Sequence, residues 1–282
     1  MRVASLLPAA TEIVAAIGGA GLLVGVSHEC DFPPDVRRLP RLTSTRLDTT
    51  RPSREIDHEM ATARRSGVSP IDTDADLLAR LRPDVVIGQS LCDVCAVGGS
   101  ELERVVAGLD PRPRAVTLHP HTLADVLADI RTVGEAIALP KRAAAVVGEL
   151  TEGIERLRAQ ARTGRRARVL VLEWIDPPYV AGHWMPELVT LAGGCDVGSA
   201  PGARSATRTW QDLERLAPDV VIVALCGFDV SRARREVAAV VDADAGAVLR
   251  RRVEFLDGNA YTSRPGPRLV EAAELLAELI AG

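Results

Sequence analysis

Aromatic side chains are scarce in this sequence, which holds only three Trp, two Tyr and three Phe among 282 residues. The interior must therefore consist mainly of Ala, Val, Leu and Ile, and the positions of the few rings become informative. Apolar runs long enough to span a bilayer are also missing, so we expect no membrane span. The formal net charge of −4 gives no excess of basic residues, so we expect no nucleic-acid partner.

A secretory signal is not evident at the start of the sequence. Pro8, Thr11 and Glu12 interrupt the first apolar stretch before an h-region could form. The five cysteines are an odd number in a long chain, which argues against a secreted disulfide framework. From these two features we expect a cytoplasmic protein with reduced thiols.

The hydrophobic pattern predicts an α/β fold. Short runs rich in Val and Ile, without polar alternation, are typical of parallel strands that are covered on both faces. Helical patterns lie between these runs, as in residues 123–138 and 266–281. The predicted strands are residues 2–7, 84–88, 168–174, 219–225 and 251–256.

An internal echo predicts two similar lobes. "LARLRPDVVIGQSLC" (78–92) resembles "LERLAPDVVIVALC" (213–226), and "TEIVAAIGG" (11–19) resembles "PELVTLAGG" (186–194). In the second pair a Glu is expected to open a helix that a Gly pair closes. We expect each lobe to hold a mainly parallel sheet flanked by helices.

A long helical connector is expected between the lobes. Apolar residues recur at helical spacing from Thr122 to Leu157, and Pro140 should end one helix or kink a longer one. The predicted division is an N-terminal lobe of residues 1–121, a connector of residues 122–163 and a C-terminal lobe of residues 164–282.

Polar and aromatic side chains follow the predicted strands. Ligands of parallel sheets bind beyond the carboxyl ends of the strands, and most of the rings fall in those loops. We therefore expect an aromatic-lined cleft between the lobes. Its predicted ligand-binding residues are His28, Glu29, Phe32, Trp174, Tyr179, His183, Trp184, Phe228, Tyr261 and Arg264.

Four cysteines belong to the same predicted edge. Cys92 and Cys95 form a C-x-x-C, and Cys30 and Cys226 lie in other strand-end loops. Four converging thiolates could hold zinc or an iron–sulfur cluster, whereas a single C-x-x-C is also compatible with incidental thiols. Cys195 is expected to be ordinary packing.

Plainer roles are expected for several other polar residues. Glu12 and Glu187 are expected to be first-turn helix charges, and His119 and His121 to belong to a surface loop. We find no persuasive Ser-His-Asp order and no phosphate-binding glycine motif, so binding is favoured over turnover.

The order of motifs resembles the cobalamin-binding and metal-chelate-binding proteins of ABC importers. The resemblance rests on "SLLPAATEIVAAIG", "LVGVSHECDFPP", "RLRPDVVIGQ", "PPYVAGHWMPELVTLAGG" and "SRPGPRLVEAAELL". It implies two α/β lobes bridged by a long helix, a cobalamin or other corrinoid or metal chelate as ligand, and an importer permease as partner. It also implies that the loops of Tyr179 to Trp184 and of Tyr261 to Arg264 face the ligand.

Three hypotheses follow. The first is non-catalytic binding of cobalamin or a related metal chelate. The second is a metalloprotein that holds zinc or an iron–sulfur cluster through its cysteines in the same cleft. The third, an enzyme that uses the C-x-x-C for redox chemistry or the cleft for hydrolysis, has the least support because catalytic partners are missing.

Overall fold

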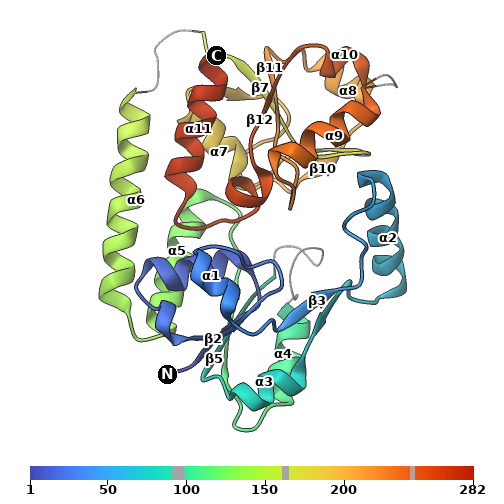
Figure 1. Ribbon diagram of the computed structural model, residues 1–282. Coiled ribbons are helices and arrows are strands. Elements are labelled where there is room, and N and C mark those ends of the chain that lie inside the picture. Colours follow the sequence, from blue (N-terminus) through green and yellow to red (C-terminus); the bar gives the residue numbers. More distant parts are fainter. Residues whose placement is uncertain (91–98, 161–164, 242–244) are drawn as a thin grey trace. The chain divides into compact units, whose positions relative to one another are not determined.

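A computed structural model describes residues 1–90, 99–160, 165–241 and 245–282. The chain forms two compact units, each with a sheet of its own. The first unit contains residues 1–49, 58–120 and 124–149, and the second contains residues 50–57, 121–123 and 150–282. The helices and strands are labelled in Figure 1.

The sheet of the first unit has four parallel strands in the order β2-β1-β5-β6. Its core packs Leu6, Leu42, Leu78 and Leu102 together, all at most 1% exposed. A two-stranded antiparallel ribbon, β3–β4, belongs to the same unit. The strands are β1 (Val3–Ser5), β2 (Leu23–Val26), β3 (Thr43–Thr45), β4 (Ile71–Thr73), β5 (Val85–Gln89) and β6 (Arg114–Leu118), and the helices between them are α1 (Pro8–Ala16), η1 (Ala20–Leu22), η2 (Pro34–Arg38), α2 (Ser53–Ser66), α3 (Ala75–Leu81) and α4 (Gly99–Ala107).

The sheet of the second unit has the strand order β10-β8-β7-β11-β12, with β9 paired to β7. Strands β7, β11 and β12 are parallel, and most residues of β7 and all of β11 are buried, whereas β8 pairs antiparallel with both β7 and β10. Helix α7 packs beside α11 (Figure 1). The elements are β7 (Arg168–Ile175), β8 (Pro178–Val180), α7 (Met185–Leu191), β9 (Cys195–Asp196), β10 (Ala206–Thr207), α8 (Trp210–Arg215), β11 (Val220–Val223), α9 (Val230–Val240), α10 (Gly246–Leu249), β12 (Arg252–Phe255), η3 (Gly258–Thr262) and α11 (Leu269–Ala281).

The internal echo corresponds to repeated structure. Asp84 precedes β5 and accepts a hydrogen bond from the backbone N–H of Arg2 at 2.6 Å. Asp219 precedes β11 and accepts the same bond from Arg168 at 2.9 Å. In each unit this bond sets the register of the two central strands, so Val3 pairs with Val85 and Val169 with Val220. The prediction of two α/β lobes with mainly parallel sheets is confirmed.

Two helices form the predicted connector. Helix α5 (Leu123–Ala136) ends before Ala138, which has a φ of 59°, and α6 (Pro140–Gln160) begins at Pro140. Proline is tolerated at the first helical position because its missing N–H would have no partner there. The residues of α6 up to Glu149 cluster with the first unit and the rest with the second, so α6 is the bridging helix.

One segment clusters differently from the predicted division. Residues 50–57 were expected in the N-terminal lobe, but they belong to the second unit. The backbone N–H of Ser53 donates to the Glu236 carboxylate at 2.9 Å, and Tyr179 donates to Asp57 at 3.0 Å. The predicted boundaries are otherwise untested and stay a prediction.

The predicted role of Glu12 is wrong, and that of Glu187 is incomplete. Helix α1 begins at Pro8, so Glu12 lies beyond its first turn and is 4% exposed. Glu187 does lie in the first turn of α7, but its carboxylate accepts a hydrogen bond from the backbone N–H of Leu123 at 2.7 Å. Glu187 therefore satisfies the N-terminus of α5 as well.

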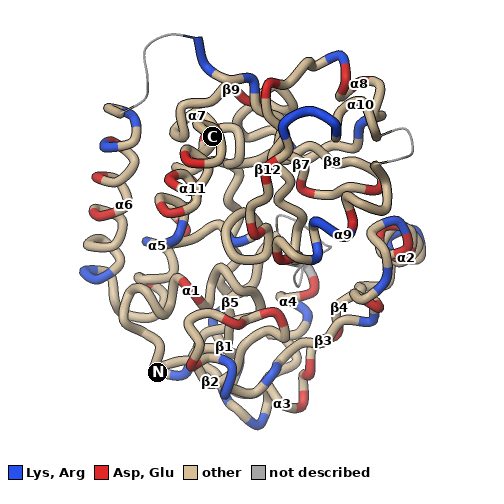
Figure 2. The backbone as a smooth tube through the Cα atoms, turned by 45° about the horizontal axis from the view of Figure 1, so that its top comes forward, with Lys and Arg blue, Asp and Glu red and all other residues tan. Residues whose placement is uncertain are grey.

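Helices α6 and α2 both carry charged residues of both signs (Figure 2). Among the described residues, no helix is both long and apolar enough to cross a membrane.

Candidate functional site

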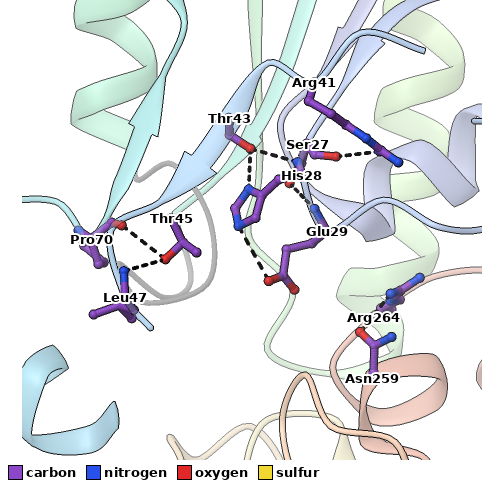
Figure 3. A network of polar contacts seen from close by, with 10 residues as sticks. All are labelled: Ser27, His28, Glu29, Arg41, Thr43, Thr45, Leu47, Pro70, Asn259 and Arg264. Carbon is purple, nitrogen blue, oxygen red and sulfur yellow. Dashed lines mark hydrogen bonds and ion pairs between the residues drawn. The ribbon is translucent and has the colours of Figure 1, made fainter. Parts of the chain in front are cut away.

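A polar network lies at the carboxyl end of β2 in the first unit (Figure 3). The backbone N–H of His28 donates to Thr43 Oγ1 at 3.1 Å, and His28 Nδ1 lies 2.7 Å from the same oxygen. His28 Nε2 lies 3.6 Å from Glu29 Oε1. Arg41 holds the loop by donating to the carbonyl oxygens of Ser27 and Cys30 at 3.0 and 2.7 Å.

This network favours a neutral His28. Thr43 Oγ1 accepts from the backbone, so its own hydrogen is available for Nδ1, which places the imidazole proton on Nε2 toward Glu29. Burial lowers the pKa of His28 below its usual value; Glu29 opposes this shift and Arg41 adds to it. The pair therefore offers an N–H and a carboxylate oxygen, with the Glu29 side chain 38% exposed.

Cys30 and Phe32 differ in their surroundings. Cys30 is 1% exposed, and its Sγ lies 3.1 Å from Thr11 Oγ1, so the thiol is part of the core of the first unit. Phe32 is 42% exposed, unlike most large apolar residues of the described chain. The ring of Phe32 can therefore meet a ligand, whereas the Cys30 thiol has almost no accessible surface.

In the second unit the structure brings together Trp174 at the end of β7 and Phe228 after β11. Their ring centroids are 5.2 Å apart, with 43° between the ring planes. The Trp174 Nε1–H donates to the carbonyl oxygen of Ser53 at 3.3 Å, and the Tyr179 hydroxyl donates to Asp57. The polar atoms of Trp174 and Tyr179 thus have protein partners, which leaves the apolar faces of these two rings as the part that can meet a ligand.

Tyr261 and Arg264 follow β12. The Tyr261 hydroxyl donates to Glu271 Oε1 at 2.9 Å, and Arg268 lies 5.3 Å from the ring centroid. The hydrogen bond to Glu271 raises the pKa of Tyr261 above its usual value. Arg264 is 4% exposed and donates from Nη2 to Asn259 Oδ1 at 2.8 Å. Its guanidinium is held in place by the same loop.

Close packing fixes the loop of Tyr261 against the loop after β11. A Cβ at Gly258 would lie 2.0 Å from the carbonyl oxygen of Leu225, a distance that real Cβ atoms do not reach. Only glycine therefore allows this approach of the two strand-end loops.

His183 and Trp184 are neighbours, and the structure adds His121 to them. The His183 ring lies 5.8 Å from Trp184 and 5.3 Å from His121. His183 has a φ of 54°, an uncommon conformation for a non-glycine residue. Trp184 is 6% exposed, and its Nε1 has no hydrogen-bond partner in the described part of the chain.

His121 was expected to be a surface-loop residue, so sequence reasoning missed its pairing with His183. The signal that could have found it is its position just after β6, where strand-end residues gather.

The predicted cysteine cluster finds no support among the described residues. Within residues 1–90, 99–160, 165–241 and 245–282, no group of three or more His, Cys, Asp or Glu side chains could hold a metal ion. Cys226 is half-buried, and Cys195 is exposed rather than packed as expected. Cys92 and Cys95 lie outside the described residues, so the C-x-x-C stays a prediction.

Two repeated α/β units, with rings and polar groups at their strand ends, define a ligand-binding protein of the two-lobe α/β class. The model of the periplasmic binding protein family matches residues 3–240, and the chain belongs to that family. Proteins of this family bind small ligands and act with an importer permease. The predicted resemblance to ABC-importer binding proteins is confirmed.

Known relatives are distant but cover almost the whole chain. The uncharacterized ABC transporter substrate-binding lipoprotein YvrC of Bacillus subtilis (strain 168) is 22% identical over 287 residues, which cover 99% of this chain and 79% of YvrC.

Two solved structures share the fold. The periplasmic vitamin B12 binding protein BtuF of Vibrio cholerae has a TM-score of 0.69 at 20% identity, covering 99% of this chain and 96% of BtuF. The apo form of the periplasmic heme-binding protein RhuT from Roseiflexus sp. RS-1 has a TM-score of 0.72 at 23% identity, covering 99% and 97%. At these identities the structures show the fold alone.

The prediction of a cytoplasmic location is wrong. The family is one of periplasmic binding proteins, and the relative YvrC is a lipoprotein, so both belong to exported classes. The absence of an evident signal was a weaker indicator than family membership.

Proposed function

We propose that this protein is the non-catalytic substrate-binding component of an ABC importer and that its ligand is a metal chelate of the corrinoid or heme type. The observation that carries the proposal is the family match over residues 3–240. The class of ligand is supported by solved relatives of the same fold whose names state that they bind vitamin B12 or heme.

The strand-end residues suit a large ligand with flat apolar faces and a polar rim. The Trp174 ring, backed by the buried ring of Phe228, offers a stacking surface, and the Trp174 indole N–H already donates to Ser53. His28 with the half-exposed Glu29 offers a donor and an acceptor for rim amides. We assign no residue a catalytic role.

The experiment is an absorbance titration of the purified protein with cyanocobalamin and, separately, with hemin. We expect a saturable spectral shift with one of the two chelates and a Trp174→Ala variant that binds roughly tenfold more weakly. Trp210→Phe is the matched control, because Trp210 begins α8 and is not a proposed site residue.

Two results would contradict the proposal. The first is the absence of a shift with either chelate while the protein remains folded by circular dichroism. The second is stoichiometric zinc, or the absorbance of an iron–sulfur cluster, in protein that binds no chelate, which would favour the cysteine-ligated metalloprotein instead.

A further inference from the structure

The 50–57 segment is fastened to the second unit by both backbone and side-chain contacts. The N–H of Ser53 donates to Glu236 Oε2 at 2.9 Å, and Arg54 pairs with Asp176 at 2.8 Å. At the far end of the segment, Asp57 accepts the Tyr179 hydroxyl at 3.0 Å. Ser53 is 1% exposed although its neighbours in the sequence are mostly charged and polar.

Glu236 on α9 is the centre of this attachment. It is 7% exposed, and its second oxygen, Oε1, accepts from Arg232 Nε at 2.8 Å. Burial alone would raise the pKa of Glu236, but the hydrogen bonds from Ser53 and Arg232 lower it below its usual value. A buried carboxylate that is charged and accepts from two partners is costly to disrupt, because removing it leaves both donors without their acceptor.

The same contacts lead to the aromatic pair. The Arg232 guanidinium carbon lies 4.5 Å from the centroid of the Phe228 ring, and Arg232 also donates to the carbonyl oxygen of Arg51. Phe228 packs on Trp174, and Trp174 Nε1 donates to the carbonyl oxygen of Ser53.

The contacts therefore form a closed ring: Glu236 to Ser53, Ser53 to Trp174, Trp174 to Phe228, Phe228 to Arg232, and Arg232 back to Glu236. Four elements contribute to this ring, namely α2, β7, the loop after β11, and α9. Breaking one contact of this closed ring loosens the restraints on all five residues, because each residue is held by a neighbour on either side.

We propose that Glu236 is a positioning residue for the ligand-binding rings: by fastening Ser53 and Arg232 it fixes the orientation of Trp174 and Phe228. The role of Trp174 and Phe228 in ligand binding rests on the proposed function, whereas the cycle of contacts that links these residues to Glu236 does not. The indole N–H faces Ser53 only while the segment is fastened, so the ring presents its apolar face.

The test compares wild-type protein with Glu236→Ala and Glu236→Gln. Glutamine retains an acceptor for the Ser53 N–H but removes the charge that pairs with Arg232. The control is Glu254→Ala, because Glu254 is also a glutamate paired with an arginine of its own element, Arg252 on strand β12. Amide hydrogen exchange, followed in a proteolytic peptide that covers residues 50–57, measures how firmly this segment is held to the second unit, and it needs no ligand.

We expect exchange of the 50–57 amides to be roughly tenfold or more faster in Glu236→Ala and to be intermediate in Glu236→Gln. The fluorescence of Trp174, obtained by subtracting the spectrum of the matching Trp174→Phe protein, should shift to longer wavelength in Glu236→Ala only. Unchanged exchange in a folded Glu236→Ala protein would overturn the proposal, and so would faster exchange with an unchanged Trp174 spectrum.

Titration with the chelate that wild-type protein binds then separates the two proposals. Chelate affinity about tenfold lower in Glu236→Ala, and near wild type in Glu254→Ala, supports the positioning role. If wild-type protein binds neither cyanocobalamin nor hemin while exchange and fluorescence respond as expected, the proposed function fails and the positioning of the rings stands.

Discussion

Arg82 and Ala217 share one backbone conformation: each has a φ of 43°, and each stands directly before a proline that leads into a buried strand. Each is followed by an aspartate, Asp84 or Asp219, that accepts the backbone N–H of an arginine at the start of the neighbouring strand. The two halves of the chain therefore repeat a local conformation as well as a sequence pattern.

Substitution of Ala217 should test this shared conformation. The left-handed region costs an L-residue roughly 1–2 kcal/mol, and most for β-branched side chains. We expect Ala217→Val to lower the free energy of unfolding by at least about 1 kcal/mol. Ala217→Gly should stay within about 0.5 kcal/mol, because relief of strain offsets the added freedom of the unfolded chain. Equal urea midpoints for the Val and Gly variants would show that the backbone of Ala217 is not strained.

Gly258 should tolerate no side chain. Its Cβ would overlap the backbone of Leu225, so Gly258→Ala must separate the loops after β11 and β12. We expect a loss of at least about 2 kcal/mol in the free energy of unfolding, measured by urea denaturation. Gly148→Ala on the exposed side of α6 meets no atom within 4 Å and should stabilise the protein by about 0.5–1 kcal/mol. A Gly258→Ala protein as stable as wild type would contradict the close approach.

Asp196 should make stability depend on pH. Burial raises its pKa to about 6, while Oδ1 accepts the N–H groups of Gly198 and Ser199. The unfolded chain loses this proton near the ordinary aspartate pKa of about 4. Between about pH 4 and pH 6 the folded state therefore binds more protons than the unfolded chain does. Its contribution to stability is thus present below about pH 4 and lost as the pH rises through about 6.

Asp196→Asn should therefore be more stable than wild type at pH 8, by about 1–3 kcal/mol, and similar to it at pH 4.5. Urea denaturation at the two pH values measures the difference. Asp212→Asn is the control: hydrogen bonds from Thr209 lower the pKa of the exposed Asp212, so this variant should show no gain at pH 8. A gain for Asp196→Asn of the same size at both pH values would show that the buried charge is not its cause.

His28 should titrate below the ordinary histidine pKa in an NMR experiment. Burial disfavours the imidazolium, so the His28 contribution to stability is complete above about pH 6.5 and is lost as the pH falls. Glu29→Gln should lower the pKa of His28 further, because the carboxylate favours the charged ring. A rise of the pKa in Glu29→Gln would contradict the facing of Nε2 and Glu29 (Figure 3).

Much of the fold was predictable because its signals are local. The Val-rich runs around residues 85 and 220 predicted buried strands, and Pro140 predicted the break between α5 and α6. The helix start at Pro8 was missed because a proline at the first helical position resembles a breaker in sequence. Glu12 was consequently expected in the first turn of this helix, whereas the helix begins at Pro8 and Glu12 lies beyond its first turn.

The candidate site was predictable only in part. The strand-end rule identified Trp174 and Phe228, which do pack together, but not the pairing of His121 with His183. Cys30 was grouped with the other cysteines by its loop, yet its thiol points into the core against Thr11. The predicted interlobe cleft and its cysteine cluster stay predictions.

By itself, the amino-acid order determined the alternation of strands and helices, the duplication and the family, because each depends on short-range periodicity and turn chemistry. Only the tertiary structure decided that Ser53 and Glu236, which are 183 residues apart, share a hydrogen bond that fastens the 50–57 segment. Such a bond depends on where two surfaces meet after folding, and no local pattern of charges around residue 53 encodes it.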